Sequence, residues 1–107
     1  MKGRVIAEVS IIPIGTGDTG VSHYVASCLE VLEGMKDLTY RLTPMGTIIE
    51  CPLDKLLEVI QQMHEVPFSK GASRVVTHLK IDDRRDKPAT MDGKVESVLK
   101  LRTSIKS

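Results

Sequence analysis

The sequence predicts an α+β fold, the split βαβ or ferredoxin-like sandwich, followed by an extra C-terminal helix. Two patterns carry this prediction: alternating apolar residues typical of strands, and apolar residues spaced three and four apart, typical of amphipathic helices. In chain order they give strand, helix, strand, strand, helix, strand, helix. We therefore expect a single ferredoxin-like domain over residues 1–107, with one hydrophobic core.

The four expected strands cover residues 4–13, 38–43, 47–51 and 72–82. In the first strand, Val5, Ala7 and Val9 fall on one face, which predicts that this face packs against helices. The short turn around Pro44 and Gly46 separates two strand patterns and predicts a hairpin.

The three expected helices cover residues 20–34, 53–65 and 91–105. Gly34 suits the end of the first helix, and the second is expected to open at Pro52 and to end before Pro67, because proline disrupts a helix interior. Thr90 is expected to cap the start of the third helix.

Right-handed crossovers then fix the topology as an antiparallel sheet of order 4-1-3-2, with the first two helices on one face. The loop at 15–20 and the hairpin turn at 44–46 should lie at the same end of the domain, opposite the charged segment 82–87. The other sheet face mixes apolar residues with polar ones, and one terminal helix is too small to cover it. We therefore expect a homo-oligomer.

Composition argues against several partners. The chain has 15 basic and 14 acidic residues and only three aromatic ones, which disfavours nucleic acid, and no apolar run is long enough to span a membrane. The N-terminus is a poor signal peptide, so we expect a cytoplasmic protein. Cys28 and Cys51 lie far apart in the sequence, and we expect them to be buried, reduced thiols.

Gly15, Gly17 and Gly20 form a G-x-G-x-x-G string between a strand and a helix. A dinucleotide site also needs an adjacent parallel strand that ends in an acidic residue. Here the next strand ends without an acidic residue and turns back as a hairpin, so we reject this kind of site. The loop can still offer backbone N–H groups to a small anion or a polar ligand edge, although Asp18 disfavours phosphate. The three histidines are not at metal-ligand spacing, and we favour local salt bridges over an ion site at 82–87.

A neutral site is predicted where the hairpin residues Thr43, Gly46 and Thr47 approach Pro13 and Gly15. Hydroxyl groups beside apolar walls are a usual lining for a small-molecule site, and Tyr40 could reach the same area. An equally favoured alternative is that these hydroxyls only satisfy backbone groups of the turn. No convincing catalytic pair and no metal site is found.

Several motifs together resemble the thiamine-binding protein family, small ferredoxin-like proteins often known only as conserved hypothetical proteins. They are Pro13-Ile14-Gly15-Thr16, Ser22-x-Tyr24-Val25, Leu42-Thr43-Pro44-Met45-Gly46-Thr47-Ile48-Ile49-Glu50, and Arg74-Val75 leading to Ile81-Asp82-Asp83-Arg84-Arg85. The resemblance implies a homotetramer built as a dimer of dimers, and a thiamine or hydroxymethylpyrimidine ligand without another cofactor. It carries ligand binding to Thr43, Gly46 and Thr47, and less closely to Pro13, Gly15, Ser22, Tyr24 and Tyr40.

Three functional hypotheses follow. The first is a non-enzymatic thiamine- or pyrimidine-binding homo-oligomer that acts as a carrier, buffer or sensor, with Glu50 or another acid facing the cationic thiazolium. The second is a ferredoxin-like regulatory or assembly module that binds another small metabolite at a subunit interface. The third, least favoured because it lacks an acid–base pair, is an enzyme acting on thiamine precursors through Glu50 or His78.

Overall fold

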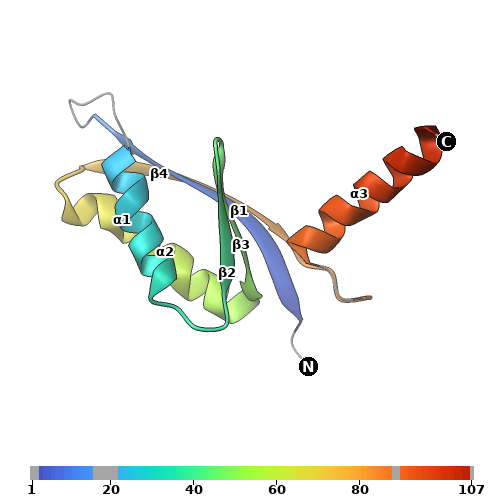
Figure 1. Cartoon of the computed structure of the whole chain (residues 1–107). Coiled ribbons are helices and arrows are strands. Elements are labelled where there is room, and N and C mark those ends of the chain that lie inside the picture. The colour runs from blue at the N-terminus through green and yellow to red at the C-terminus, as the bar shows by residue number, and fades with distance from the viewer. Residues whose placement is uncertain (1–2, 16–21, 88–89, 107) are drawn as a thin grey trace.

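The computed structural model describes residues 3–15, 22–87 and 90–106. Its elements follow the predicted order (Figure 1): β1 (Arg4–Ile14), α1 (Ser22–Glu33), β2 (Thr39–Thr43), β3 (Gly46–Pro52), α2 (Leu53–Ser69), β4 (Arg74–Asp82) and α3 (Met91–Lys106). The bounds agree with the sequence patterns within a few residues at most ends. The exceptions are the end of α2 and the start of β4.

The strands form one antiparallel sheet of order β2-β3-β1-β4, which confirms the predicted ferredoxin-like topology. β1 is the longest strand and one of the two inner strands of the sheet, and it extends beyond the hairpin. Thr47 near the start of β3 pairs with Val9, whereas Pro13 and Ile14 pair only with β4. The hairpin therefore ends about 13 Å before the end of β1, at 3.3 Å per strand residue.

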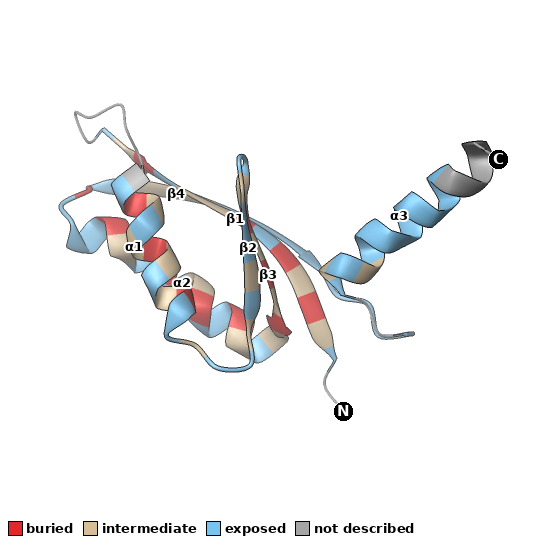
Figure 2. Cartoon of the chain, viewed as in Figure 1, coloured by how far each residue is buried: buried red, intermediate tan, exposed pale blue. Residues whose placement is uncertain are grey.

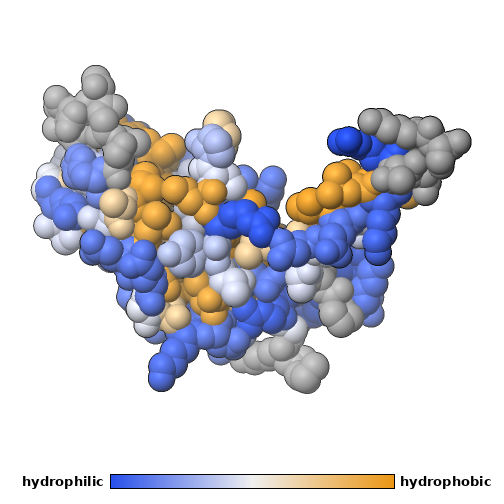
Figure 3. All heavy atoms as spheres, viewed as in Figure 1, coloured by the Kyte–Doolittle hydropathy of each residue, from blue (hydrophilic) through white to orange (hydrophobic). Residues whose placement is uncertain are grey.

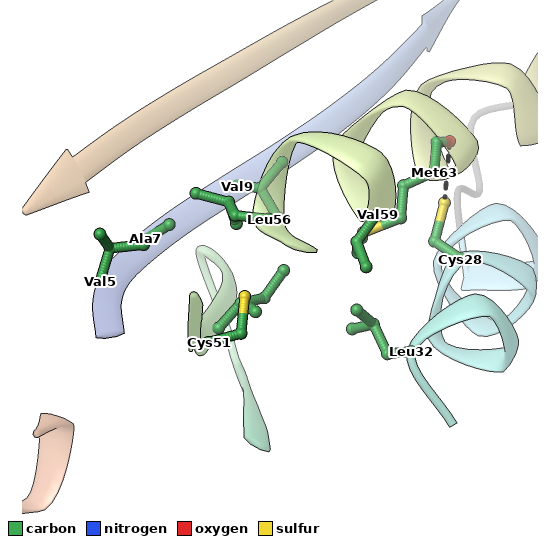
Figure 4. Packing of buried hydrophobic residues seen from close by; sticks show 10 residues of the cluster. Val5, Ala7, Val9, Cys28, Leu32, Cys51, Leu56, Val59 and Met63 are labelled. Atoms are coloured by element: carbon green, nitrogen blue, oxygen red, sulfur yellow. Dashed lines mark hydrogen bonds between the residues drawn. The ribbon is translucent and has the colours of Figure 1, made fainter. Parts of the chain in front are cut away.

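The hydrophobic core lies between the sheet and the two helices α1 and α2, on one side only (Figures 1 and 2). Strand residues at every second position point into it, and the apolar stripes of both helices close it (Figure 4). Its most buried members are Val5, Ala7, Val9, Leu32, Ile49, Cys51, Leu56, Val59 and Met63. Among the residues that the structure describes, no helix lies over the opposite side, called the open face below.

The second helix does not end before Pro67, as the sequence had suggested, but continues to Ser69. Proline removes the N–H that would bond to the carbonyl four residues earlier, on Met63. The Cys28 thiol donates a weak hydrogen bond to that carbonyl at 3.6 Å, so the helix keeps a partner there. The helix begins at Leu53, the first residue of its predicted range, and Pro52, which closes β3, stands at the N-cap position.

Gly71, rather than Pro67, terminates α2. Its φ of 101° lies in the region that only glycine adopts freely, and its N–H donates to Phe68 O at 3.1 Å. The Ala72 N–H donates to Pro67 O at 3.0 Å, which completes a Schellman motif. This turn occupies the residues just before Arg74 and delays the fourth strand by two positions relative to the predicted start.

The third helix, called the arm below, projects away from the sandwich (Figure 1). The Cα radius of gyration is 16.0 Å, whereas a compact chain of this length would have about 13 Å. Thr90 caps the arm as predicted: its Oγ1 accepts the Gly93 N–H at 2.9 Å. Among the described residues, no helix is long and apolar enough to cross a membrane.

Candidate functional site

The strand register divides the predicted site residues between the two faces of the sheet. Thr43 pairs with Gly46, and both lie on the open face. Tyr40 pairs with the buried Ile49, and Leu42 pairs with Thr47. The side chains of Tyr40, Leu42 and Thr47 therefore lie on the helix side. The hairpin therefore presents two different chemical surfaces, one on each face of the sheet.

On the open face, the hydroxyl of Thr43 is engaged within the turn. It donates to Gly46 O at 2.8 Å and accepts the Met45 N–H at 3.3 Å. The Ser10 hydroxyl of β1 donates to Met45 O at 3.0 Å and ties the turn to the central strand. The alternative that hydroxyls satisfy turn backbone thus describes Thr43 in this structure.

Gly46 is required by a close approach between strands. A Cβ added at this position would lie 3.0 Å from both Val9 O and Ser10 Oγ. The first of these atoms is backbone and cannot easily give way. The glycine of the turn thus allows β3 to approach β1, and it positions Thr47, the next residue, over the helix side.

Thr47 is the one polar residue among the described part of the chain that is buried, with 6% of its surface exposed. It lies between Val9 of β1 and Leu42 of β2. Leu42 points to the helix side and is nevertheless 54% exposed, because neither helix covers the end of the hairpin. Figure 3 shows apolar side chains exposed beside the hairpin in this region. A hydroxyl at the edge of an exposed apolar wall can orient a polar group on a flat ligand.

Tyr40 continues the same surface toward the end of α1. Its side chain is half-buried against the core, and its hydroxyl donates to Glu33 Oε1 at 3.5 Å. We call the helix-side positions Tyr40, Leu42 and Thr47 the hairpin surface. It combines an aromatic ring, an aliphatic side chain, a hydroxyl and, through Glu33, a nearby acid.

The remaining predicted residues lie farther along β1 and on α1. Pro13 is buried, but it is four residues past Val9, so about 13 Å separates it from the level of Thr47. Gly15 has a φ of 74°, which favours glycine, and Tyr24 is 6% exposed with its ring 4.0 Å from that of His23. Ser22 begins α1, and its side chain lies outside the described residues, as does the rest of the glycine-rich loop, 16–21.

Glu50 is a residue of β3 whose side chain lies on the open face, where it contacts the arm and not the hairpin surface. Its carboxylate accepts the Met91 N–H at 3.0 Å and lies 3.6 Å from the Arg4 guanidinium. His78, the other candidate proton carrier, pairs with Ser10, whereas Glu50 pairs with Ile6. These levels are four residues apart on β1, about 13 Å, so the two side chains do not form an acid–base pair.

The charged segment after β4 forms local ion pairs, as favoured from the sequence. Arg84 binds Asp86 at 2.7 Å and Arg85 binds Asp83 at 2.8 Å. Hydrogen bonds from these arginines hold the pKa of both carboxyl groups below the usual range. No group of three metal-ligating side chains occurs in the part of the chain that the structure describes.

Comparison with known proteins identifies the family. The sequence profile described as thiamine-binding protein matches residues 7–99. The chain belongs to the thiamine-binding protein family. It is 53% identical over 98 residues to the UPF0045 protein YqgV of Bacillus subtilis, covering 89% of this chain and 94% of that protein.

Two solved structures of relatives share the fold. The hypothetical protein MJ1052 of Methanocaldococcus jannaschii superimposes with a TM-score of 0.80 at 40% identity, covering 89% of this chain and 95% of that one. A Thermotoga maritima protein named for thiamine biosynthesis or salvage gives a TM-score of 0.72 at 18% identity, covering 89% and 98%. The second likeness concerns the fold alone.

Sequence reasoning missed three residues of this region. The sequence did indicate the face of Leu42, because Leu42 alternates with Tyr40. Its exposure, however, depends on where the helices end. No sequence pattern pointed to Ser10 or Glu33. Their contacts depend on the register between β1 and the hairpin and on the position of α1.

Proposed function

We propose that this member of the family binds thiamine, or its hydroxymethylpyrimidine moiety, at the hairpin surface, without catalysis and as a homo-oligomer. The observation that carries the proposal is the hydroxyl-bearing residue Thr47, only 6% exposed, beside the exposed Leu42. The matching family profile favours thiamine over other flat heterocycles of similar size.

The chemistry of the ligand suits these groups. An aminopyrimidine is a flat ring whose edge carries both donors and acceptors, and a threonine hydroxyl can serve as either. Leu42 and the Tyr40 ring supply apolar area for the ring faces. Glu33, which accepts from the Tyr40 hydroxyl, is an acid on the correct side of the sheet to face a cationic thiazolium, whereas Glu50 is on the other side.

A binding role also agrees with the surroundings of Glu50, one of the two candidate proton carriers. Glu50 is 12% exposed at its side chain and engaged by Arg4 and the Met91 N–H. We infer a carrier, buffer or sensor of the bound compound. A regulatory module that binds another metabolite is the competing proposal, and it predicts no response to thiamine or its pyrimidine.

The test is a thermal shift and calorimetric titration with thiamine, hydroxymethylpyrimidine and thiamine phosphate. A ligand at 100 times its Kd should add about 2.7 kcal/mol to the stability of the folded chain. Thr47→Val should weaken binding about tenfold, as expected for one lost hydrogen bond of about 1.4 kcal/mol, without changing the oligomer mass.

Thr39→Val is the matched control, because Thr39 lies on the open face, where its hydroxyl is 3.4 Å from Glu50. It should leave the affinity for all three compounds unchanged. Absence of any shift in a folded wild-type oligomer would refute thiamine binding. Equal losses in the two threonine variants would remove the hairpin surface from the proposal.

A further inference from the structure

The hairpin surface has a charged neighbour at its Tyr40 end. The Tyr40 hydroxyl donates to Glu33 Oε1 at 3.5 Å, and Glu33 is the exposed last residue of α1. The helix-side positions of the hairpin itself carry no charge: they are Tyr40, Leu42, Thr47, Ile49 and Cys51. The Glu33 carboxylate therefore decides the sign of the charge at this end of the surface.

The dipole of α1 has the same sign at this end. The helix runs from Ser22 to Glu33 and leads into β2, so its C-terminal carbonyl groups lie at the Tyr40 end (Figure 1). A helix C-terminus carries a partial negative charge, which basic residues in the last turn can offset. α1 has no basic residue in its last turn and no Lys or Arg between residues 22 and 33.

The arginines of the neighbouring strands are engaged elsewhere. Arg41 of β2 lies on the open face, where it binds Asp92 at 2.6 Å. Arg4 of β1 binds Asp37 at 2.6 Å. Lys36 lies past the end of α1, in the connection to β2, and is exposed. The two guanidinium groups are thus held by carboxylates and do not offer a phosphate site at the hairpin surface.

We propose that the hairpin surface selects its ligand by charge and in one orientation. It takes unphosphorylated thiamine, with the cationic thiazolium beside Tyr40 and Glu33 and the pyrimidine beside Thr47, and it disfavours thiamine that carries a phosphate. This inference rests on the proposed function and specifies the chemical form of the ligand.

The spacing of the surface suits this orientation. Tyr40 and Thr47 lie two residues apart along the strands, about 7 Å, which suits two rings that are joined by a single methylene bridge. The face of the Tyr40 ring also attracts a cation. The hydroxyethyl group of thiamine is attached to the thiazolium ring, so a phosphate on it would bring up to two negative charges to the Glu33 end. Like charges at this end would then oppose binding.

The test is a calorimetric titration of the full chain with thiamine, thiamine phosphate and the uncharged hydroxymethylpyrimidine. At low salt, thiamine should bind about tenfold more tightly than thiamine phosphate, because several weak charge interactions change sign together. The ratio should shrink when the salt concentration rises from about 0.01 M to about 1 M, since the screening length falls from about 30 Å to about 3 Å. The affinity for hydroxymethylpyrimidine should not change with salt.

Glu33→Gln removes the charge but keeps a carbonyl oxygen that can accept from the Tyr40 hydroxyl. It should weaken thiamine binding about threefold, strengthen thiamine phosphate binding, and leave hydroxymethylpyrimidine unaffected. Glu96→Gln is the matched control, because it makes the same change in net charge at an exposed position of the arm. It should leave all three affinities unchanged.

Two kinds of failure are distinguishable. If thiamine binds and thiamine phosphate binds equally well, or if the two glutamine variants behave alike, charge selection by Glu33 is overturned and the proposed function stands. If none of the three compounds binds the folded wild-type chain, the proposed function fails and this inference fails with it.

Discussion

The helix-covered face of the sheet and the arm contain similar aliphatic side chains but bury them to very different extents. Leu56 and Val59 of α2 are fully buried, whereas Val98 and Leu101 of α3 are more than half exposed. The difference arises from position rather than composition. α2 crosses back over β3, β1 and β4, whereas α3 projects away from the sandwich after the last strand.

The largest expected effect concerns two adjacent leucines on α2. Leu56→Ala should lower the free energy of unfolding by about 3 kcal/mol, because it removes a fully buried side chain and leaves a cavity. Leu57→Ala makes the same change at a position that is 54% exposed, and should cost less than about 1 kcal/mol. Urea denaturation of both variants measures the difference. Similar losses would contradict the placement of the core on one face of α2.

An intermediate effect is expected from the thiol of Cys51, a fully buried member of the core. Burial raises the pKa of Cys51 to about 11, from an ordinary value of 9.0. Between these pH values the unfolded chain releases the thiol proton while the folded chain retains it. The free energy of unfolding should therefore fall as pH rises from 9 to 11, by at most about 1.4 kcal/mol per pH unit.

Cys51→Val removes this group and should reduce the alkaline loss of stability. The measurement is urea denaturation of both proteins at several pH values between 8 and 11. Cys28 remains as a second buried thiol whose pKa is also raised by burial, so a smaller slope should persist in the variant. Identical slopes in the two proteins would show that Cys51 releases its proton without unfolding.

Much of the architecture follows from local sequence patterns. The alternation from Val5 to Val9 fixed the buried face of β1, and the turn at Pro44 placed the hairpin. The end of α2 did not follow, because the carbonyl orphaned by Pro67 is satisfied by Cys28 on another helix. Such a contact is a property of tertiary packing and leaves no local signal.

The candidate site was less predictable than the fold. Thr43 and Thr47 are four residues apart in one motif, yet the turn between them places them on opposite faces of the sheet. The alternation of side chains within one strand does not predict which face a residue beyond the turn occupies. The contacts of Glu50 likewise depend on the arm, because its carboxylate accepts the N–H of Met91, 41 residues away in the sequence.

The smallest effect is expected at the cap of the arm. Thr90→Ala removes the acceptor of the Gly93 N–H, which should destabilise the first turn of α3 by about 1 kcal/mol. The urea midpoint of the sandwich should move very little, because the arm lies outside the core. Amide hydrogen exchange should accelerate near the start of the arm and remain unchanged in α2. A loss of global stability comparable to that of Leu56→Ala would mean that the arm and the sandwich unfold as one cooperative unit.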